Sequence, residues 1–271
     1  MQKMNNEYYC LVAGLAEYSY ADKRGKIDIE AIRTEINEVL SAQDKKALEL
    51  LYLYYDIENV VNILNNSKLP FNVLGNLTRV QVEEEISAFE TDDEPFESLL
   101  PPPLRLTLDR YLGRYVAEDD ELNFDKSLLE KSLHADYFLL CSTIKCDFLR
   151  KWCEYDRIIR NIIAVRRAAQ LEKEPIMVGE LEDEREFEYY SELISVLETR
   201  DFVERETKMD MLRLTIAEGL SEHNYFDINM LLAYLVKLNI LFRWSSLDKK
   251  VGEERFRAIV KGFTDSAQIN I

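Results

Sequence analysis

Apolar residues recur at every third or fourth position along most of this sequence, which is the period of an amphipathic helix. The clearest case lies in residues 44–64, where one apolar stripe has spacings of 4, 3, 4 and 3. This stripe consists of Leu50, Tyr54, Ile57, Val61 and Leu64. The alternation of apolar and polar residues that marks β-strands is nearly absent. The pattern therefore predicts an all-α protein.

A second long stripe lies in the middle of the chain. It belongs to a predicted helix that begins near Asp125 and runs, in one or two pieces, to about Gln170. Its seam is formed by Phe148, Trp152, Tyr155, Ile159, Ile162 and Arg166. Shorter periodic stretches predict further helices at residues 27–40, 186–201, 204–220, 228–244 and 253–263.

Two breaks in the pattern suggest how the chain is divided. Pro101-Pro102-Pro103 follows an acidic stretch and cannot lie in the interior of a helix. We therefore expect an N-terminal helical lobe over residues 1–100 and a C-terminal helical lobe over residues 104–271. A second break near residues 171–185 could divide the latter into two units.

The net charge of the chain bears on which kinds of molecule it can bind. The formal net charge is -17, from 51 acidic and 34 basic residues. Such a field repels phosphate backbones, so nucleic acid is not an expected partner. No uncharged run exceeds the ten residues from Leu69 to Thr78, which is too short to span a membrane. The apolar stretch from Tyr8 to Ala16 is interpreted as a buried first element, and the protein as cytoplasmic.

Residues that could carry chemistry are few and poorly placed for it. The four cysteines, of which three lie on one predicted helix, are expected to be buried free thiols, since residues seven apart on a helix are about 10 Å apart. His134 and His223 lack the Glu-x-x-His spacing of di-iron bundles and are expected to be exposed or half-buried. The acidic clusters at 92–94 and 119–121 resemble exposed loops more than magnesium sites. We therefore predict no catalytic, cofactor-binding or metal-binding residues, and no enzyme activity.

Two helical segments carry the same polar set inside an apolar stripe. Residues 53–64 contain Asp56 and Asn59, and residues 152–169 contain Asp156 and Asn161. The Asp and Asn are three positions apart in the first segment and five apart in the second, so aligning the two segments requires a two-residue insertion. Any amphipathic helix carries some polar residues beside its stripe, but two copies favour a shared structural role. We expect these four residues to brace neighbouring helices, with Asn161 in an interhelical hydrogen bond, and to leave no pocket for reaction chemistry.

The chain resembles the C subunit of the prokaryotic V/A-type ATPases, which is related to the d subunit of the vacuolar enzyme. That family repeats an Asp-x-x-Asn-apolar helix, similar to Asp56-Ile57-Glu58-Asn59-Val60-Val61 and, with the insertion, to Asp156 through Arg166. Its C-terminal pattern is similar to Tyr234-Leu235-Val236-Lys237 followed by 254–262, and its entry segment to residues 8–15. The resemblance is patchy along the whole chain. It implies a divergent member of the kind encoded in bacterial V-type ATPase operons, with an elongated or funnel-like array of similar helical units.

The resemblance implies a non-catalytic part of the central stalk. Such a component would lie on the cytoplasmic face of the membrane rotor ring, without entering the membrane, and would accept the shaft. Arg157, Arg160, Arg166 and Arg167 form the one basic concentration on a helical seam and are candidate partner contacts. The alternative is a helical scaffold or regulatory adaptor unrelated to ATPases. An all-α enzyme using the acidic clusters is the third possibility.

Overall fold

The computed structural model describes residues 8–18, 27–88, 96–114, 128–179, 184–222 and 226–246. Within these ranges the protein is all-α, as the apolar period predicts, and no strand occurs. The helices are α1 (Tyr9–Gly14), α2 (Ile29–Val39), α3 (Ala42–Leu64), α4 (Arg79–Ser87), α5 (Pro102–Tyr111), α6 (Leu129–Thr143), α7 (Asp147–Gln170), α8 (Tyr190–Leu197), α9 (Phe202–Ser221) and α10 (Ile228–Ser246). The predicted helix at 253–263 lies outside the described residues.

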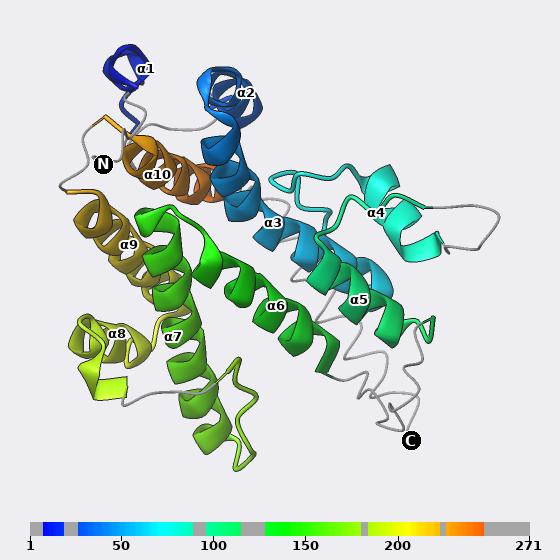
Figure 1. Ribbon diagram of the computed structural model, residues 1–271. Helices are drawn as coiled ribbons and strands as arrows, with labels where there is room; N and C mark the ends of the chain where they lie inside the picture. Colours follow the sequence, from blue (N-terminus) through cyan, green and yellow to red (C-terminus); the bar gives the residue numbers. More distant parts are fainter. Residues whose placement is uncertain are drawn as a thin grey trace.

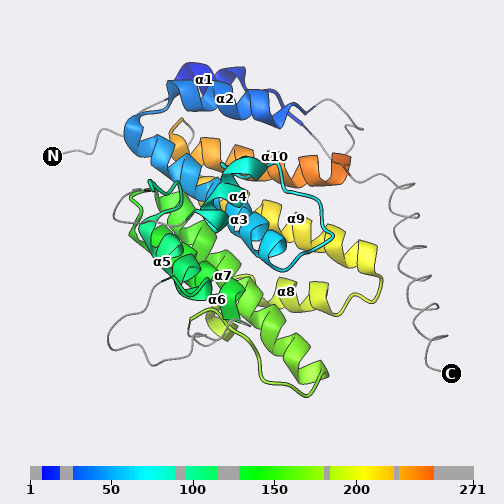
Figure 2. The ribbon, with the colours of Figure 1, turned by 90° about the vertical axis from the view of Figure 1, so that its right-hand side faces the viewer.

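The two longest helices, α3 and α7, run through the body of the protein (Figure 1). Helix α10 lies between α2 on one side and α7 and α9 on the other, and it also contacts α3. Figure 2 shows α1 and α2 as the outermost layer beyond α10. Because the C-terminal helix α10 packs between elements from both halves of the chain, the main core crosses the boundary predicted at Pro101–Pro103.

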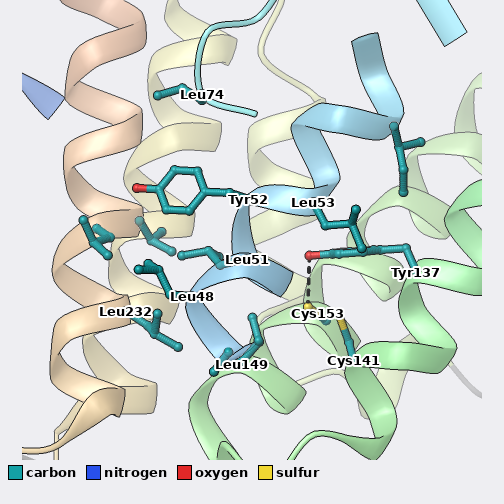
Figure 3. Close-up of a cluster of buried hydrophobic side chains, with 14 of the residues drawn as sticks. Leu48, Leu51, Tyr52, Leu53, Leu74, Tyr137, Cys141, Leu149, Cys153 and Leu232 are labelled. Carbon is teal, nitrogen blue, oxygen red and sulfur yellow. Dashed lines mark hydrogen bonds between the residues drawn. The ribbon is translucent and has the colours of Figure 1, made fainter. Parts of the chain in front are cut away.

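The core is a continuous set of buried side chains centred on α3. Tyr52 is fully buried, and its hydroxyl donates a hydrogen bond to Oδ1 of Asn239 on α10 (3.1 Å). On the other side of α3, the Tyr137 hydroxyl lies 3.4 Å from Sγ of Cys153 (Figure 3). A smaller apolar cluster joins α7, α8 and α9 around Ile162 and Leu193. The long helices are thus held by packing on several sides.

Some boundaries and exposures differ from the expectation. The region predicted to be helical in one or two pieces up to Gln170 contains two helices, because the chain is extended at Ile144 before α7 begins. The buried cysteines consequently lie on α6, on α7 and at the N-cap of α7, whereas Cys10 is exposed. The predicted buried first element is buried only in part, because Tyr8 is buried whereas α1 itself has no buried residue. In the described part of the chain, no helix combines the length and apolar character needed to cross a membrane.

Candidate functional site: two asparagine-held loops and a charged cavity

Asn59 on α3 holds the loop that follows its own helix. After α3 ends, Asn66 adopts a left-handed conformation (φ 50°) and the chain turns back along the helix. The Asn59 amide then pairs with the backbone of Asn72, donating to its carbonyl (2.9 Å) and accepting from its N–H (2.7 Å). Asn59 is buried. The side-chain amide of Asn59 thus pairs with both the N–H and the C=O of one backbone residue, as the backbone of a neighbouring β-strand would.

Asp56, one turn earlier, holds the next part of the same loop. Its carboxylate accepts from both the N–H (3.1 Å) and the Nδ2 (2.8 Å) of Asn76, and from the N–H of Leu77 (2.9 Å). Burial raises the pKa of Asp56, and these hydrogen bonds oppose that rise. Gly75 is required at this point because a Cβ there would overlap the carboxylate of Asp56. From α2, Arg33 donates to the carbonyl oxygens of the same segment.

Asn161 on α7 makes the corresponding contact with the loop after α7. That helix also ends in a left-handed residue, Glu172 (φ 52°). The Asn161 amide donates to the carbonyl of Val178 (3.0 Å) and accepts from its N–H (2.9 Å). Asn161 is buried, and the residue after Val178, Gly179, has a φ of 71°. Both side-chain hydrogen bonds of Asn161 therefore go to a loop, and the predicted interhelical bond is not formed.

The two loops are built alike, and we refer to 65–77 and 171–179 as the held loops. Each contains Lys-x-Pro before the held backbone, as Lys68-Leu69-Pro70 and as Lys173-Glu174-Pro175. Each has a left-handed residue at its second position and a glycine shortly after the held residue. These shared strings are the signal in the sequence that marks the loops, and helical periodicity does not detect it. The braces predicted at Asn59, Asn161 and Asp56 act between a helix and its own following loop, not between neighbouring helices.

Another buried asparagine followed by apolar residues lies on α10. Asn239-Ile240-Leu241 has the same pattern as Asn59-Val60-Val61 and Asn161-Ile162-Ile163. Its Oδ1 accepts the Tyr52 hydroxyl of α3, so this copy does make a contact between helices. It was not among the residues predicted from the sequence.

Asp156 has a different role from Asp56. Its carboxylate accepts a hydrogen bond from Nε of Arg160 (2.6 Å), and the guanidinium of Arg213 on α9 lies 3.8 Å away. Burial alone would raise the pKa of Asp156, but the positive charges of Arg160 and Arg213 outweigh it and lower that pKa. Arg160 also donates to the Tyr54 hydroxyl of α3. Asp156 therefore links α7 to α9 directly and to α3 through Arg160.

A cavity of about 320 Å³ lies beside Asp156, between α3, α6, α7, α9 and α10. Its charged lining comprises Glu58, Asp156, Arg160, Asp210, Arg213 and Arg243. Aromatic side chains that include Tyr54, Tyr55 and Trp152 form much of the rest. Asp156 therefore lies at a cavity, although the two polar segments were expected to leave no pocket for reaction chemistry.

The four candidate partner arginines are dispersed by the fold. Arg160 is engaged in the cavity with Asp156, and Arg157 lies close to Gly179 in the second held loop. Arg166 is exposed and donates to the Tyr190 hydroxyl at the start of α8 (2.9 Å). Within the described residues, Arg167 is exposed and its side chain makes no hydrogen bond or ion pair. The four do not form one basic surface.

His134 is buried, contrary to the prediction of an exposed or half-buried side chain. Its Nδ1 lies 2.7 Å from the carbonyl of Glu130, and its ring packs against Tyr54. Nε2 is buried without a hydrogen-bond partner in the described structure. Burial, followed by the nearby charge of Arg160, lowers the pKa of His134. His223 and the acidic clusters at 92–94 and 119–121 lie outside the described residues.

The fold and these sites define an all-helical protein in which two long helices each hold their own following loop. Among the described residues, no group of histidine, cysteine and acidic side chains is arranged to hold a metal ion. The chain belongs to the family described as "Protein of unknown function (DUF2764)", whose model matches residues 4–267. No curated protein matches the chain.

Proposed function

We propose that this protein is a non-catalytic central-stalk component of a V-type ATPase, which links the shaft to the membrane rotor ring. The observation that carries the proposal is the repeated helix–loop unit. Asn59 and Asn161 each pair with the backbone of the loop after their own helix. These asparagines lie in the two sequence strings that resemble the repeated helix of the V/A-type ATPase C subunit.

A part that transmits torque must resist bending, and the observed units serve that need. Helices α3 and α7 have 23 and 24 residues, so each extends for about 35 Å. The held loops restrict the end of each helix, because two or more side-chain hydrogen bonds tie the returning chain to it. The protein would thereby behave as a stiff connector between two partners.

The held loops also offer apolar side chains to a protein partner. Leu69 is 65% exposed and Val73 71% exposed in the first loop, and Leu171 and Ile176 are 56% and 62% exposed in the second. Fixing exposed aliphatic residues on a restrained backbone lowers the conformational entropy lost when a partner binds. We infer that these loops contact the shaft or the rotor ring.

The proposal is tested by purification from the native cell. The chain would carry an affinity tag at its own locus, and membranes would be solubilised in a mild detergent before mass spectrometry. We expect shaft and ring proteins to co-purify with it. Recovery of an assembled V-type ATPase through a tag on another component, without this chain, would contradict the proposal and favour the scaffold or adaptor alternative.

A pair of variants separates loop contact from general surface effects. Leu69→Ser combined with Ile176→Ser removes apolar groups from both held loops, whereas Leu139→Ser changes a side chain on α6 that is 61% exposed. We expect the loop variant to co-purify less ATPase while its circular dichroism spectrum stays the same. The α6 variant should co-purify as much ATPase as the wild type. Equal recovery with both variants would show that the held loops are not the contact.

A further inference from the structure

The cavity between α3, α6, α7, α9 and α10 contains side-chain donors that make no hydrogen bond among the described residues. Arg213 lies 3.5 Å from Oδ1 of Asp210 and 3.8 Å from Oδ1 of Asp156, and it makes no hydrogen bond among the described residues. The hydroxyl of Tyr55 and the Nδ2 of Asn239 also lack a hydrogen-bond partner in the described structure. Three donors from three helices thus line one space.

Asp156 and Asp210 each accept hydrogen bonds through Oδ2, whereas Oδ1 of each lies at ion-pair distance from Arg213. Asp156 accepts from Arg160, and Asp210 accepts from Arg243 and from the indole N–H of Trp244. Glu58, the remaining acid, accepts from Nδ2 of Asn72 (3.1 Å). Arg213 makes no hydrogen bond to either Oδ1, so its N–H groups remain able to bind the acceptor oxygens of a ligand.

The size and walls of the cavity limit the ligand further. A volume of about 320 Å³ is at the lower end of the range for small-molecule pockets, which is roughly 300–1,000 Å³. Tyr54, Phe138 and Trp152 supply apolar and aromatic surface. The guanidinium of Arg213 is at the solvent-accessible part of the cavity, since its side chain is 24% exposed. A small anion can therefore reach it.

We propose that this cavity binds a small oxyanion, a carboxylate or a phosphate, through Arg213, with Tyr55 and Asn239 as further donors. Arg213 would bind two oxygen atoms of the anion with two parallel N–H groups. The aromatic wall would accommodate an apolar body attached to the anionic group. This proposal does not depend on the role in an ATPase.

Titration with two probes tests the proposal and identifies the preferred anion. Inorganic phosphate and benzoate would be titrated into the full chain by calorimetry, with sodium chloride at equal ionic strength as the reference. Trp152 lines the cavity and supplies a second readout through its fluorescence. We expect one site per chain for at least one probe. Phosphate binding alone identifies a phosphoryl ligand, and benzoate binding alone identifies a carboxylate.

Three variants assign the binding to the cavity. Arg213→Gln should weaken binding about tenfold to a hundredfold, because a hydrogen-bonded charge is removed. Tyr55→Phe should weaken it several-fold without changing the fold, since the hydroxyl has no hydrogen-bond partner in the described structure. Arg79→Gln, whose side chain is 66% exposed on α4, should bind as the wild type does.

The outcomes that overturn the proposal are specific. One is the absence of binding by the wild-type chain for both probes up to about 10 mM. Another is an unchanged affinity in folded Arg213→Gln. If circular dichroism shows that Arg213→Gln does not fold, Tyr55→Phe decides, and an unchanged affinity in that variant overturns the proposal.

Discussion

Replacing Asn161 with leucine should release the second held loop while keeping the size of the side chain. The change removes both hydrogen bonds to Val178, which measure 3.0 and 2.9 Å. Two neutral hydrogen bonds contribute about 1–3 kcal/mol, and buried backbone groups left unpaired add to that loss. If the loop opens, water forms hydrogen bonds with the unpaired backbone groups of Val178 and reduces this added loss. We therefore expect the free energy of unfolding to fall by about 2–4 kcal/mol.

Urea denaturation and hydrogen exchange measure the global and the local effect. The urea midpoint should fall at an unchanged slope, because the surface exposed on unfolding stays nearly the same. The Val178 amide should exchange faster, since it loses its acceptor on Asn161. Asn62→Leu is the matched control, because Asn62 is half-buried on α3 and its side chain makes no hydrogen bond within the described residues. It should leave both readings nearly unchanged.

Two results would refute this reasoning. One is a loss of stability below about 0.5 kcal/mol, which is the size of an ordinary surface substitution. The other is a comparable loss in Asn62→Leu, which would show that any leucine on these helices is harmful. Either result would mean that the loop is held by its own packing and that the paired amide bonds contribute little.

Three further predictions concern other parts of the site. Gly75→Ala should destabilise the protein by about 1–3 kcal/mol in a thermal melt, because the new Cβ overlaps Asp56, whereas Gly14→Ala, with open space around it, should be neutral or stabilising. The lowered pKa of His134 means that the unfolded chain binds its proton first, so stability should fall as the pH drops below about 6.5. Urea titrations at pH 7.5 and 5.5 measure how much the free energy of unfolding falls between the two pH values. This fall should be smaller for His134→Phe than for the wild type, and an equal fall would contradict the prediction. Asp156→Asn should cost about 2–3 kcal/mol by urea denaturation, because two partly buried arginines lose their counter-charge, and a loss near zero would show that the pair is solvent-screened.

The sequence predicted the helices well because their signals are local. The predicted helix at 44–64 is close to α3 at Ala42–Leu64, whose start is fixed by the Ser41 side chain accepting the N–H of Asp44. The helix at 228–244 is close to α10 at Ile228–Ser246. The division of residues 125–170 was open, because the break at Ile144-Lys145-Cys146 contains neither proline nor glycine to mark it.

The site could be predicted only in part. The apolar stripes identified Asn59 and Asn161 as buried polar residues, but their partners lie 13 and 17 residues further along the chain. Helical periodicity does not indicate which path the chain follows after a helix ends, or which residues of the loop contact the helix. The cavity was missed because Asp210 and Arg213 on α9 resemble ordinary surface charges in the sequence. They become a buried pair only when α9 packs against α7 and α10.

The two held loops should differ in how readily they open, because the copies have diverged at one position. The position three residues before the asparagine is Asp56 in α3 and Ile158 in α7. The first loop consequently makes five hydrogen bonds with Asn59 and Asp56, and the second makes two with Asn161. Asp156 does not compensate, since it faces the cavity instead.

The three hydrogen bonds with Asp56, at about 1 kcal/mol each, by themselves correspond to roughly a hundredfold difference in opening. In native-state hydrogen exchange, the Leu77 amide should therefore be protected about a hundredfold more than the Val178 amide. Asp56→Asn weakens the acceptor and should narrow this difference, because an amide offers one oxygen where the carboxylate offers two. Equal protection of the two amides in the wild-type chain would show that neither loop opens independently of global unfolding.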